Sequence, residues 1–213
     1  MVLIQSSTVF RRRAACAHVV LAMLASGVAA EAADAGSGPA TAVDAGVIDP
    51  GARAPTVPEP EGYRTEEYRK PVPATLKGAM VLTPTQASEL WTKGATPFID
   101  VYPYAPKPDN LPAGTLWREP QHFSIEGATW LANAGYGTLS PGTEAYFKSN
   151  LERLSGGDKG KALVFFCLRN CWMSWNAAKR AMTYGYTNVL WFSEGTDAWQ
   201  EIGQPIAEAK PYH

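Results

Sequence analysis

A short apolar run that ends in a cysteine, followed by a second cysteine and a helix-like stretch, constrains the fold of this chain more than any other feature. The apolar run covers residues 162–166, the cysteines are Cys167 and Cys171, and the helix-like stretch begins at Trp172. A strand, a tight loop and a helix in this order place Cys167 at the edge of a sheet, facing the loop amides and the positive end of the helix dipole. Such surroundings favour the thiolate, which is the nucleophilic form of cysteine. The segment therefore predicts sulfur chemistry at a sheet edge.

The first 30 residues have the pattern of a secretory signal peptide. Three arginines at 11–13 precede an apolar stretch over residues 14–25, and small residues at 28–30 fit a cleavage site. The stretch is shorter than the roughly 20 apolar residues of a membrane-spanning helix. We expect export by the general route in preference to the twin-arginine route, and removal of Cys16 with the signal. The sequence thus predicts a periplasmic protein that does not stay in the membrane after cleavage.

The cysteine count and the charge narrow the chemistry of the exported chain. Cys167 and Cys171 are then the only cysteines left, in a compartment where disulfides form and persist. Their redox state is therefore the central question. The chain has 19 basic and 20 acidic residues and a formal net charge of −1, so no strong field attracts nucleic acid. We expect no nucleic-acid partner.

Composition also divides the chain into segments. Residues 31–61 are dominated by Ala, Gly, Pro and Asp, a composition that predicts a disordered linker because it offers too little apolar surface to offset the entropy of ordering. Residues 62–79 carry aromatic and basic side chains such as Tyr63 and Tyr68, and we expect an extended arm that lies on the domain. A single domain is predicted at 80–207.

Within that domain, helix and strand patterns alternate. Thr83 and Gln86 form a capping box and Gly94 marks a helix end. Alternation of this kind predicts an α/β fold, a central parallel sheet with helices on both faces. Ligands of such sheets bind at the carboxyl ends of the strands, where Cys167 and Asp100 both lie. The expected helices are 84–93, 141–154, 172–184 and 196–202. The expected strands are 97–102, 162–166 and 188–192, with a further short strand near 127–130. The rest of residues 103–142 is expected to be mostly irregular up to the second helix.

Several of these segments resemble a rhodanese domain, over roughly residues 80–205. The resemblance rests on Asp100 within the strand at 98–101, on His122 with the turn at 125–128, and on the segments 165–167, 176–179, 185–189 and 195–199. More narrowly, the cysteine pair followed by Trp172 is similar to periplasmic rhodanese-like proteins that are named for a Cys-Cys-Trp (CXXCW) motif and associated with pyrroloquinoline-quinone (PQQ)-dependent alcohol catabolism. The resemblance implies a rhodanese-like fold.

The same resemblance implies a sulfurtransferase that needs no cofactor or metal. Cys167 would take a sulfane sulfur from a small donor, hold it as a persulfide and pass it to an acceptor such as a protein thiol. Persulfides are anionic, and buried amide donors stabilise such a charge. The residues implied in binding the donor are Leu168, Arg169, Asn170, Trp172 and Met173, while Asp100 and His122 are expected to support the loops structurally.

Departures from the rhodanese pattern leave alternatives open. The cysteine loop is one residue longer than in most rhodaneses and lacks the arginine usual near its end, which also argues against the related phosphatases. The second cysteine, Cys171, allows a thiol-disulfide redox protein in which an exposed Cys167 attacks and Cys171 resolves. It also allows a permanent structural disulfide, or capture of Cu(I) together with His122 or His213.

Two further functions to compare are covalent haem binding and a non-catalytic binding role. Covalent haem is excluded because Trp172 stands where the attachment motif requires a histidine. The quinoprotein association allows a non-catalytic role, in which the domain binds a quinoprotein alcohol dehydrogenase during its maturation. No residue of the chain identifies that partner.

Overall fold

Five parallel strands form the central sheet of this protein, in a computed structural model that describes residues 57–105 and 107–213. The expected signal peptide, Cys16 and most of the expected linker lie outside these residues. The strand order is β1-β6-β5-β2-β4, and each neighbouring pair is parallel. The strands are β1 (Met80–Val81), β6 (Val189–Phe192), β5 (Leu163–Phe166), β2 (Phe98–Asp100) and β4 (Thr129–Trp130).

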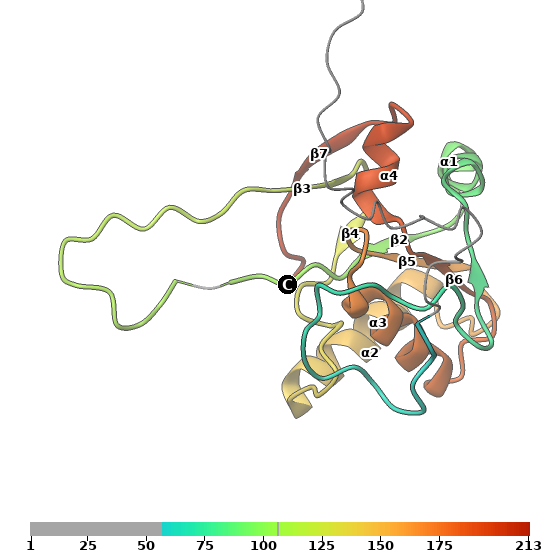
Figure 1. The fold of residues 1–213 in the computed structure, drawn as a ribbon, viewed down its shortest axis with the longest axis horizontal. Helices are drawn as coiled ribbons and strands as arrows, with labels where there is room; N and C mark the ends of the chain where they lie inside the picture. Colours follow the sequence, from blue (N-terminus) through green and yellow to red (C-terminus); the bar gives the residue numbers. More distant parts are fainter. Residues whose placement is uncertain (1–56, 106) are drawn as a thin grey trace, which may run out of the picture. The chain divides into compact units, whose positions relative to one another are not determined.

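Helices cover both faces of this sheet, as Figure 1 shows. On one face, α2 (Pro141–Ser155) and α3 (Trp172–Thr183) pack over Leu163 and Phe165 of β5. On the other, α1 (Pro84–Lys93) and α4 (Gly195–Glu201) pack over Val164 and Phe166. Every residue of β5 and β6 is buried, which is why these strands read as continuous apolar runs. The predicted α/β class, with a parallel sheet between helices, is confirmed.

Local signals in the sequence place the helix ends. Thr83 caps α1 through the predicted capping box with Gln86, and Gly94 ends the helix in the left-handed conformation with φ 68°. Ser140 caps α2 through the amide of Thr143. These caps satisfy amides and carbonyls that a helix leaves unpaired at its ends. All four expected helices form within one or two residues of their predicted bounds.

A second, two-stranded sheet was not predicted. It pairs β3 (His122–Ile125) with β7 (Ile206–Ala209) in antiparallel register. The strand β7 runs past residue 207, and beyond it the amide of Tyr212 donates to the carbonyl of Trp130 at 2.9 Å. The ordered chain therefore continues beyond the expected domain boundary. Between β2 and β3 the described residues form no helix or strand.

Residues 57–79, which we call the arm, form no helix or strand and join the body of the domain by side-chain contacts. Leu76 is buried and anchors the C-terminal part of the arm in the core. Val57 packs against the same apolar cluster. The carboxylate of Glu59 accepts hydrogen bonds from the Thr75 hydroxyl and from the amide of Lys77, the second at 2.9 Å. The arm thus begins within residues that the sequence assigned to the linker.

Among the residues that the structure describes, no helix has the length and apolarity needed to cross a membrane.

Candidate functional site

Cys167 and Cys171 are joined by a disulfide at the carboxyl edge of the sheet. Cys167 follows the last residue of β5, Cys171 is the N-cap of α3, and their Cα atoms are 6.2 Å apart. Both cysteines are 1% exposed. The expectation of an exposed, attacking Cys167 thiol therefore needs correction, because in this structure the sulfur is buried and already bonded.

The cysteine loop, residues 167–171, closes its turn at Asn170, which has a φ of 56°. Asparagine adopts this left-handed conformation more readily than most residues. The turn brings Cys171, rather than Cys167, to the positive end of α3. The sequence placed both the sheet edge and the helix dipole at Cys167, whereas the structure divides them between the two cysteines.

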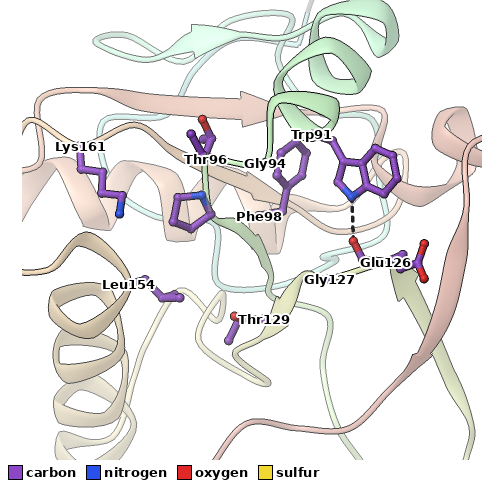
Figure 2. Close-up of a pocket in the computed structure, with 11 residues that line it drawn as sticks. Trp91, Gly94, Thr96, Phe98, Glu126, Gly127, Thr129, Leu154 and Lys161 are labelled. Carbon is purple, nitrogen blue, oxygen red and sulfur yellow. Dashed lines mark hydrogen bonds between the residues drawn. The ribbon is translucent and has the colours of Figure 1, made fainter. Parts of the chain in front are cut away.

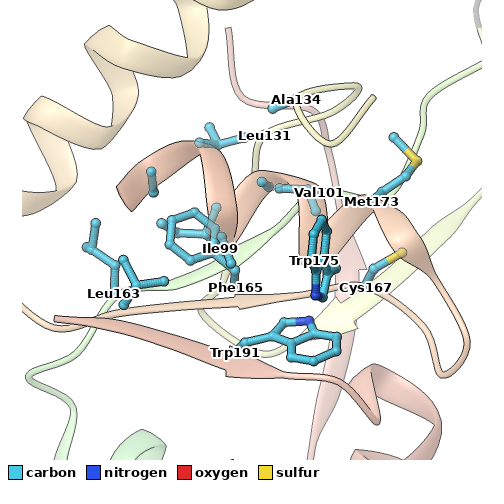
Figure 3. Close-up of a cluster of buried hydrophobic side chains, with 14 of the residues drawn as sticks. Ile99, Val101, Leu131, Ala134, Leu163, Phe165, Cys167, Met173, Trp175 and Trp191 are labelled. Carbon is cyan, nitrogen blue, oxygen red and sulfur yellow. The ribbon is translucent and has the colours of Figure 1, made fainter. Parts of the chain in front are cut away.

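The cysteines belong to the apolar core on the α2–α3 side of the sheet. Figure 3 shows Cys167 and Met173 among the buried side chains that include Trp175 and Trp191. Trp191 donates from its indole nitrogen to the Ser174 hydroxyl at 3.0 Å. The apolar side chains around the disulfide exclude water. A reagent therefore reaches the sulfurs only after some of these packed residues move.

Several of the loop's polar groups are already paired within the protein. The amide of Arg169 donates to Asp197 Oδ2 at 2.7 Å, and the amide of Trp172 donates to the carbonyl of Tyr68 in the arm at 2.9 Å. Leu168 forms a β-bridge with Gly195. The expected cradle of free amides from Leu168 to Met173 is therefore partly occupied by protein acceptors in this structure.

The side chain of Arg169 is paired as well. Its Nε donates to Glu194 Oε2 at 2.5 Å, and its two terminal nitrogens donate to the carboxylate oxygens of Glu201 at 2.8 and 2.6 Å. These bonds, first from Glu201 and then from Glu194, raise the pKa of Arg169 further above its usual range. The expectation that Arg169 offers its charge to an anionic donor is corrected here, since two carboxylates already neutralise it.

Asp100 and His122, which the sequence indicated separately, come together in the structure, and Ser124 joins them. Asp100 ends β2 and is 1% exposed. Its Oδ2 accepts from the Ser124 hydroxyl at 2.6 Å and lies 2.7 Å from His122 Nε2, while its Oδ1 accepts from the amide of Tyr102 at 2.8 Å. A buried carboxylate with three donors fixes the ends of β2 and β3 against each other. Structural support stays a prediction for Asp100 and His122, and this geometry favours it.

The arm is the part of the site that sequence reasoning missed. The Tyr68 carbonyl accepts from the Trp172 amide, and the Pro71 carbonyl accepts from the Trp172 indole at 3.1 Å. Aromatic and basic residues between positions 63 and 69 were the signal that the arm lies on the domain. That signal did not say where on the domain it lies.

Capture of Cu(I), one of the alternatives left open by the sequence, needs two free thiolates, whereas the two sulfurs are bonded to each other here. Within residues 57–105 and 107–213, no group of three or more His, Cys, Asp or Glu side chains is arranged to hold a metal ion.

A cavity of about 440 Å³ lies at the opposite end of the sheet, as shown in Figure 2. It is lined by Phe98 and Thr129, the first residues of β2 and β4, and by Lys161, which precedes β5. The cysteine loop follows the last residue of β5. The cavity is therefore at the amino ends of the strands and does not belong to the cysteine site.

No protein-family model matches the chain, and no curated protein sequence matches it either. Solved structures that are similar to it include a polysulfide-sulfur transferase homodimer from Wolinella succinogenes, with a TM-score of 0.39 and 20% sequence identity over 64% of this chain and 83% of that chain. An uncharacterized protein from Saccharomyces cerevisiae is similar with a TM-score of 0.36 and 17% identity, over 59% of this chain and 93% of that chain.

Proposed function

We propose that this chain is a rhodanese-like sulfur carrier in which Cys167 holds a sulfane sulfur as a persulfide and Cys171 closes a disulfide on it. The observation that carries the proposal is the Cys167–Cys171 disulfide, placed between the carboxyl end of β5 and the N-terminus of α3. The pair is thus positioned to alternate between a disulfide and a state in which Cys167 carries a further sulfur atom.

From the disulfide, a hydrosulfide ion would load Cys167 directly. The ion attacks Sγ of Cys167, the S–S bond breaks, and its electron pair leaves on Sγ of Cys171. The products are a persulfide on Cys167 and a thiolate on Cys171, and the step needs no other oxidant or reductant. Since Cys171 is the N-cap of α3, the helix dipole stabilises the leaving thiolate. Thiol-disulfide exchange favours the better leaving group, so the helix directs attack to Cys167.

From the reduced pair, a sulfane donor such as thiosulfate would load the same residue. The Cys167 thiolate attacks the outer sulfur of thiosulfate, and sulfite leaves with the electron pair of the broken S–S bond. In the absence of an acceptor, the Cys171 thiolate attacks Sγ of Cys167 and hydrosulfide leaves, which restores the disulfide. Cys171 therefore limits how long the persulfide lasts.

A thiol-disulfide redox protein is the second candidate, and the same disulfide supports it. Here a protein thiolate attacks Cys167, a mixed disulfide forms, and a second thiol of the partner resolves it, leaving the pair reduced. The two candidates differ in the species that Cys167 carries, which is a persulfide in one and a mixed disulfide with a protein in the other.

One experiment separates them. Oxidised wild type and the variants Cys167→Ala and Cys171→Ala are treated with sodium sulfide or, after reduction, with thiosulfate, alkylated, and examined by peptide mass spectrometry. Sulfur carriage predicts that sulfide adds one sulfur to Cys167 of oxidised wild type but not of Cys171→Ala, which has no disulfide for sulfide to attack. Thiosulfate should add one sulfur to Cys167 of both reduced proteins, and this sulfur should last longer in Cys171→Ala. An unmodified Cys167 in both proteins, together with a trapped mixed disulfide to a thioredoxin-like reductant, would favour the redox candidate instead.

A periplasmic location is part of the proposal. It is supported by the leader pattern in the first 30 residues and by the disulfide, which persists in oxidising compartments. We also propose, on the sequence resemblance alone, that the protein acts in PQQ-dependent alcohol oxidation. It would act there as a sulfur carrier or as a maturation factor for a quinoprotein dehydrogenase. Fractionation of cells that make the full chain tests the location, and co-purification with a quinoprotein dehydrogenase tests the partner.

A further inference from the structure

The arm lies along one face of α3, beside the disulfide. Donors on this face recur at positions 172, 175, 176 and 179, which is the spacing of one helix face. Each donates to a backbone carbonyl of the arm. The Trp175 indole donates to the carbonyl of Thr75 at 3.3 Å, and the ammonium of Lys179 donates to the carbonyls of Pro60 and Glu61 at 2.9 and 2.6 Å.

The pairing of Asn176 with Arg64 is reciprocal. The amide of Arg64 donates to Asn176 Oδ1 at 2.9 Å, and Asn176 Nδ2 donates to the carbonyl of Arg64 at 2.8 Å. The guanidinium of Arg64 also lies 5.4 Å from the ring centroid of Trp172. The arm is thus bound at the residue that directly follows Cys171.

Apolar contacts bring the arm onto the cluster that holds both sulfurs. Val57, Tyr68 and Val72 of the arm pack against the buried group that includes Cys167 and Cys171. Since each cysteine is 1% exposed, an attacking sulfur reaches the disulfide only after packed residues move. Two covers contact the cysteine loop or the residue that follows it: the arm, through the Trp172 amide, and the α4 side, through the Cys167 carbonyl.

The two covers differ in how they are built. On the α4 side the contacts are made by the main chain, with the amide of Thr196 donating to the carbonyl of Cys167 at 3.0 Å and Leu168 bridged to Gly195. The arm, in contrast, has no regular secondary structure, and more than half of its residues are exposed. Segments held in this way open at a lower free-energy cost than the rest of a domain.

We propose that the arm is a strap that must leave α3 before a thiol or an anionic sulfur compound can reach the Cys167–Cys171 disulfide. The inference deepens the proposed function, because it concerns access to the same disulfide. In the resting state the strap protects the disulfide from small thiols. Partners or substrates that displace the strap gain access to Cys167.

Gly137 offers a way to push the strap away without touching the cysteine loop. A Cβ at Gly137 would lie 2.2 Å from the Arg64 carbonyl oxygen, a contact that forces the arm to move. Lys179→Ala loosens the strap differently, by removing two hydrogen bonds at its N-terminal end. Two matched controls are available on α2. A Cβ at Gly142 meets only the Ser140 hydroxyl oxygen, at 3.9 Å, and Lys148 is a lysine that pairs with Glu144 and lies over Tyr184.

The test measures how fast a small phosphine reduces the disulfide in oxidised, full-length protein. In parallel, hydrogen exchange is followed at the Trp172 amide, which is bonded to the Tyr68 carbonyl. Lys179→Ala should speed reduction on the order of tenfold, the effect of losing one or two hydrogen bonds from the closed state. Gly137→Ala should speed reduction at least as much, because its Cβ clashes with the Arg64 carbonyl of the arm. The Trp172 amide should exchange faster in step, and Gly142→Ala and Lys148→Ala should match wild type.

Two results would overturn the strap. One is faster exchange at Trp172 in Lys179→Ala with an unchanged rate of reduction, since the arm would then leave without exposing the sulfurs. The other is protection of the Trp172 amide up to global unfolding in wild type and in Lys179→Ala, since the arm would then never open by itself. Phosphine reduction requires no sulfur transfer. The test of the strap therefore gives its answer whether or not Cys167 forms a persulfide.

Discussion

Gly195 lies against the carbonyl of Cys167 so closely that a Cβ at Gly195 would be 2.1 Å from that oxygen. The glycine also has a φ of 54°, a conformation that costs other residues roughly 1–2 kcal/mol. This contact fixes the position of the cysteine loop relative to α4. The loop geometry therefore depends on a residue far along the chain from either cysteine.

Gly195→Ala should accordingly lower the free energy of unfolding by several kcal/mol, because it adds a backbone clash to the conformational strain. Gly203→Ala is the matched control, since Gly203 has a φ of 71° but no atom within 4 Å of an added Cβ. That control should cost only the strain, about 1–2 kcal/mol. Urea unfolding of both oxidised variants measures the difference. Equal costs would show that the loop moves away from residue 195 without loss.

Asp100→Asn should lower the free energy of unfolding by about 2–3 kcal/mol, because the amide cannot accept all the hydrogen bonds that the carboxylate receives. Ser124→Ala removes only one of these bonds and should cost about 1 kcal/mol. Urea unfolding checks both values. Asp100→Asn should still form a persulfide on Cys167 under conditions where it is folded. Loss of the persulfide in folded Asp100→Asn would give Asp100 a role in the chemistry and not only in support.

Closure of the disulfide should stabilise the fold modestly. The bond closes a loop of five residues, for which the chain-entropy relation gives about 2 kcal/mol, less than a disulfide across a long loop gives. Urea unfolding of the oxidised protein and of the protein kept reduced by a phosphine should differ by about that amount. A difference near zero would mean that the bond serves reactivity alone.

Sequence reasoning succeeded where the signals are local. The capping box at Thr83, the proline after Ser140 and the apolar run of β5 are each contained in a few residues, and each element formed where it was expected. The short ladder of β3 with β7 was missed because its strands are far apart in the sequence and only partly buried, so neither carries a continuous apolar pattern. Pairing across such separations is decided by the assembled core.

The site, too, was predictable only where its signals are local in the sequence. The sequence indicated that Cys167 and Cys171 share a tight loop, and that Cys167 and Asp100 lie at the carboxyl edge of the sheet. It did not indicate that His122 lies beside Asp100. It did not indicate that Arg169 is held by Glu194 and Glu201, because these carboxylates lie on another element. It also did not indicate that the arm accepts the amide of Trp172, since a backbone carbonyl carries no residue-specific signal.

The pairing of Arg169 with Glu201 should make part of the protein's stability depend on pH. The hydrogen bond from Arg169, the largest contribution that lowers it, holds the pKa of Glu201 below its usual value. A lowered carboxyl pKa in the folded state contributes stability that is present above the unfolded pKa and is lost as the pH falls through the folded value. Wild type should therefore be more stable than Arg169→Met at pH 7, and the two should converge in acid, below both pKa values.

Urea unfolding across that pH range measures the difference in stability. Added salt should reduce this difference at pH 7, because the side chains of Arg169 and Glu201 are 36% and 60% exposed. When Glu201 is already replaced by Gln, adding Arg169→Met should change the free energy of unfolding by an amount that depends little on pH.

The pairing between Lys148 and Glu144 gives a comparison on another helix, since Lys148 likewise lowers the pKa of Glu144. Lys148→Met should show the same loss of stability above the unfolded pKa, but only Arg169→Met should also change how fast a phosphine reduces the disulfide. A reduction rate unaffected by Arg169→Met would show that the amide of Arg169, bonded to Asp197, holds the cysteine loop without help from the side chain.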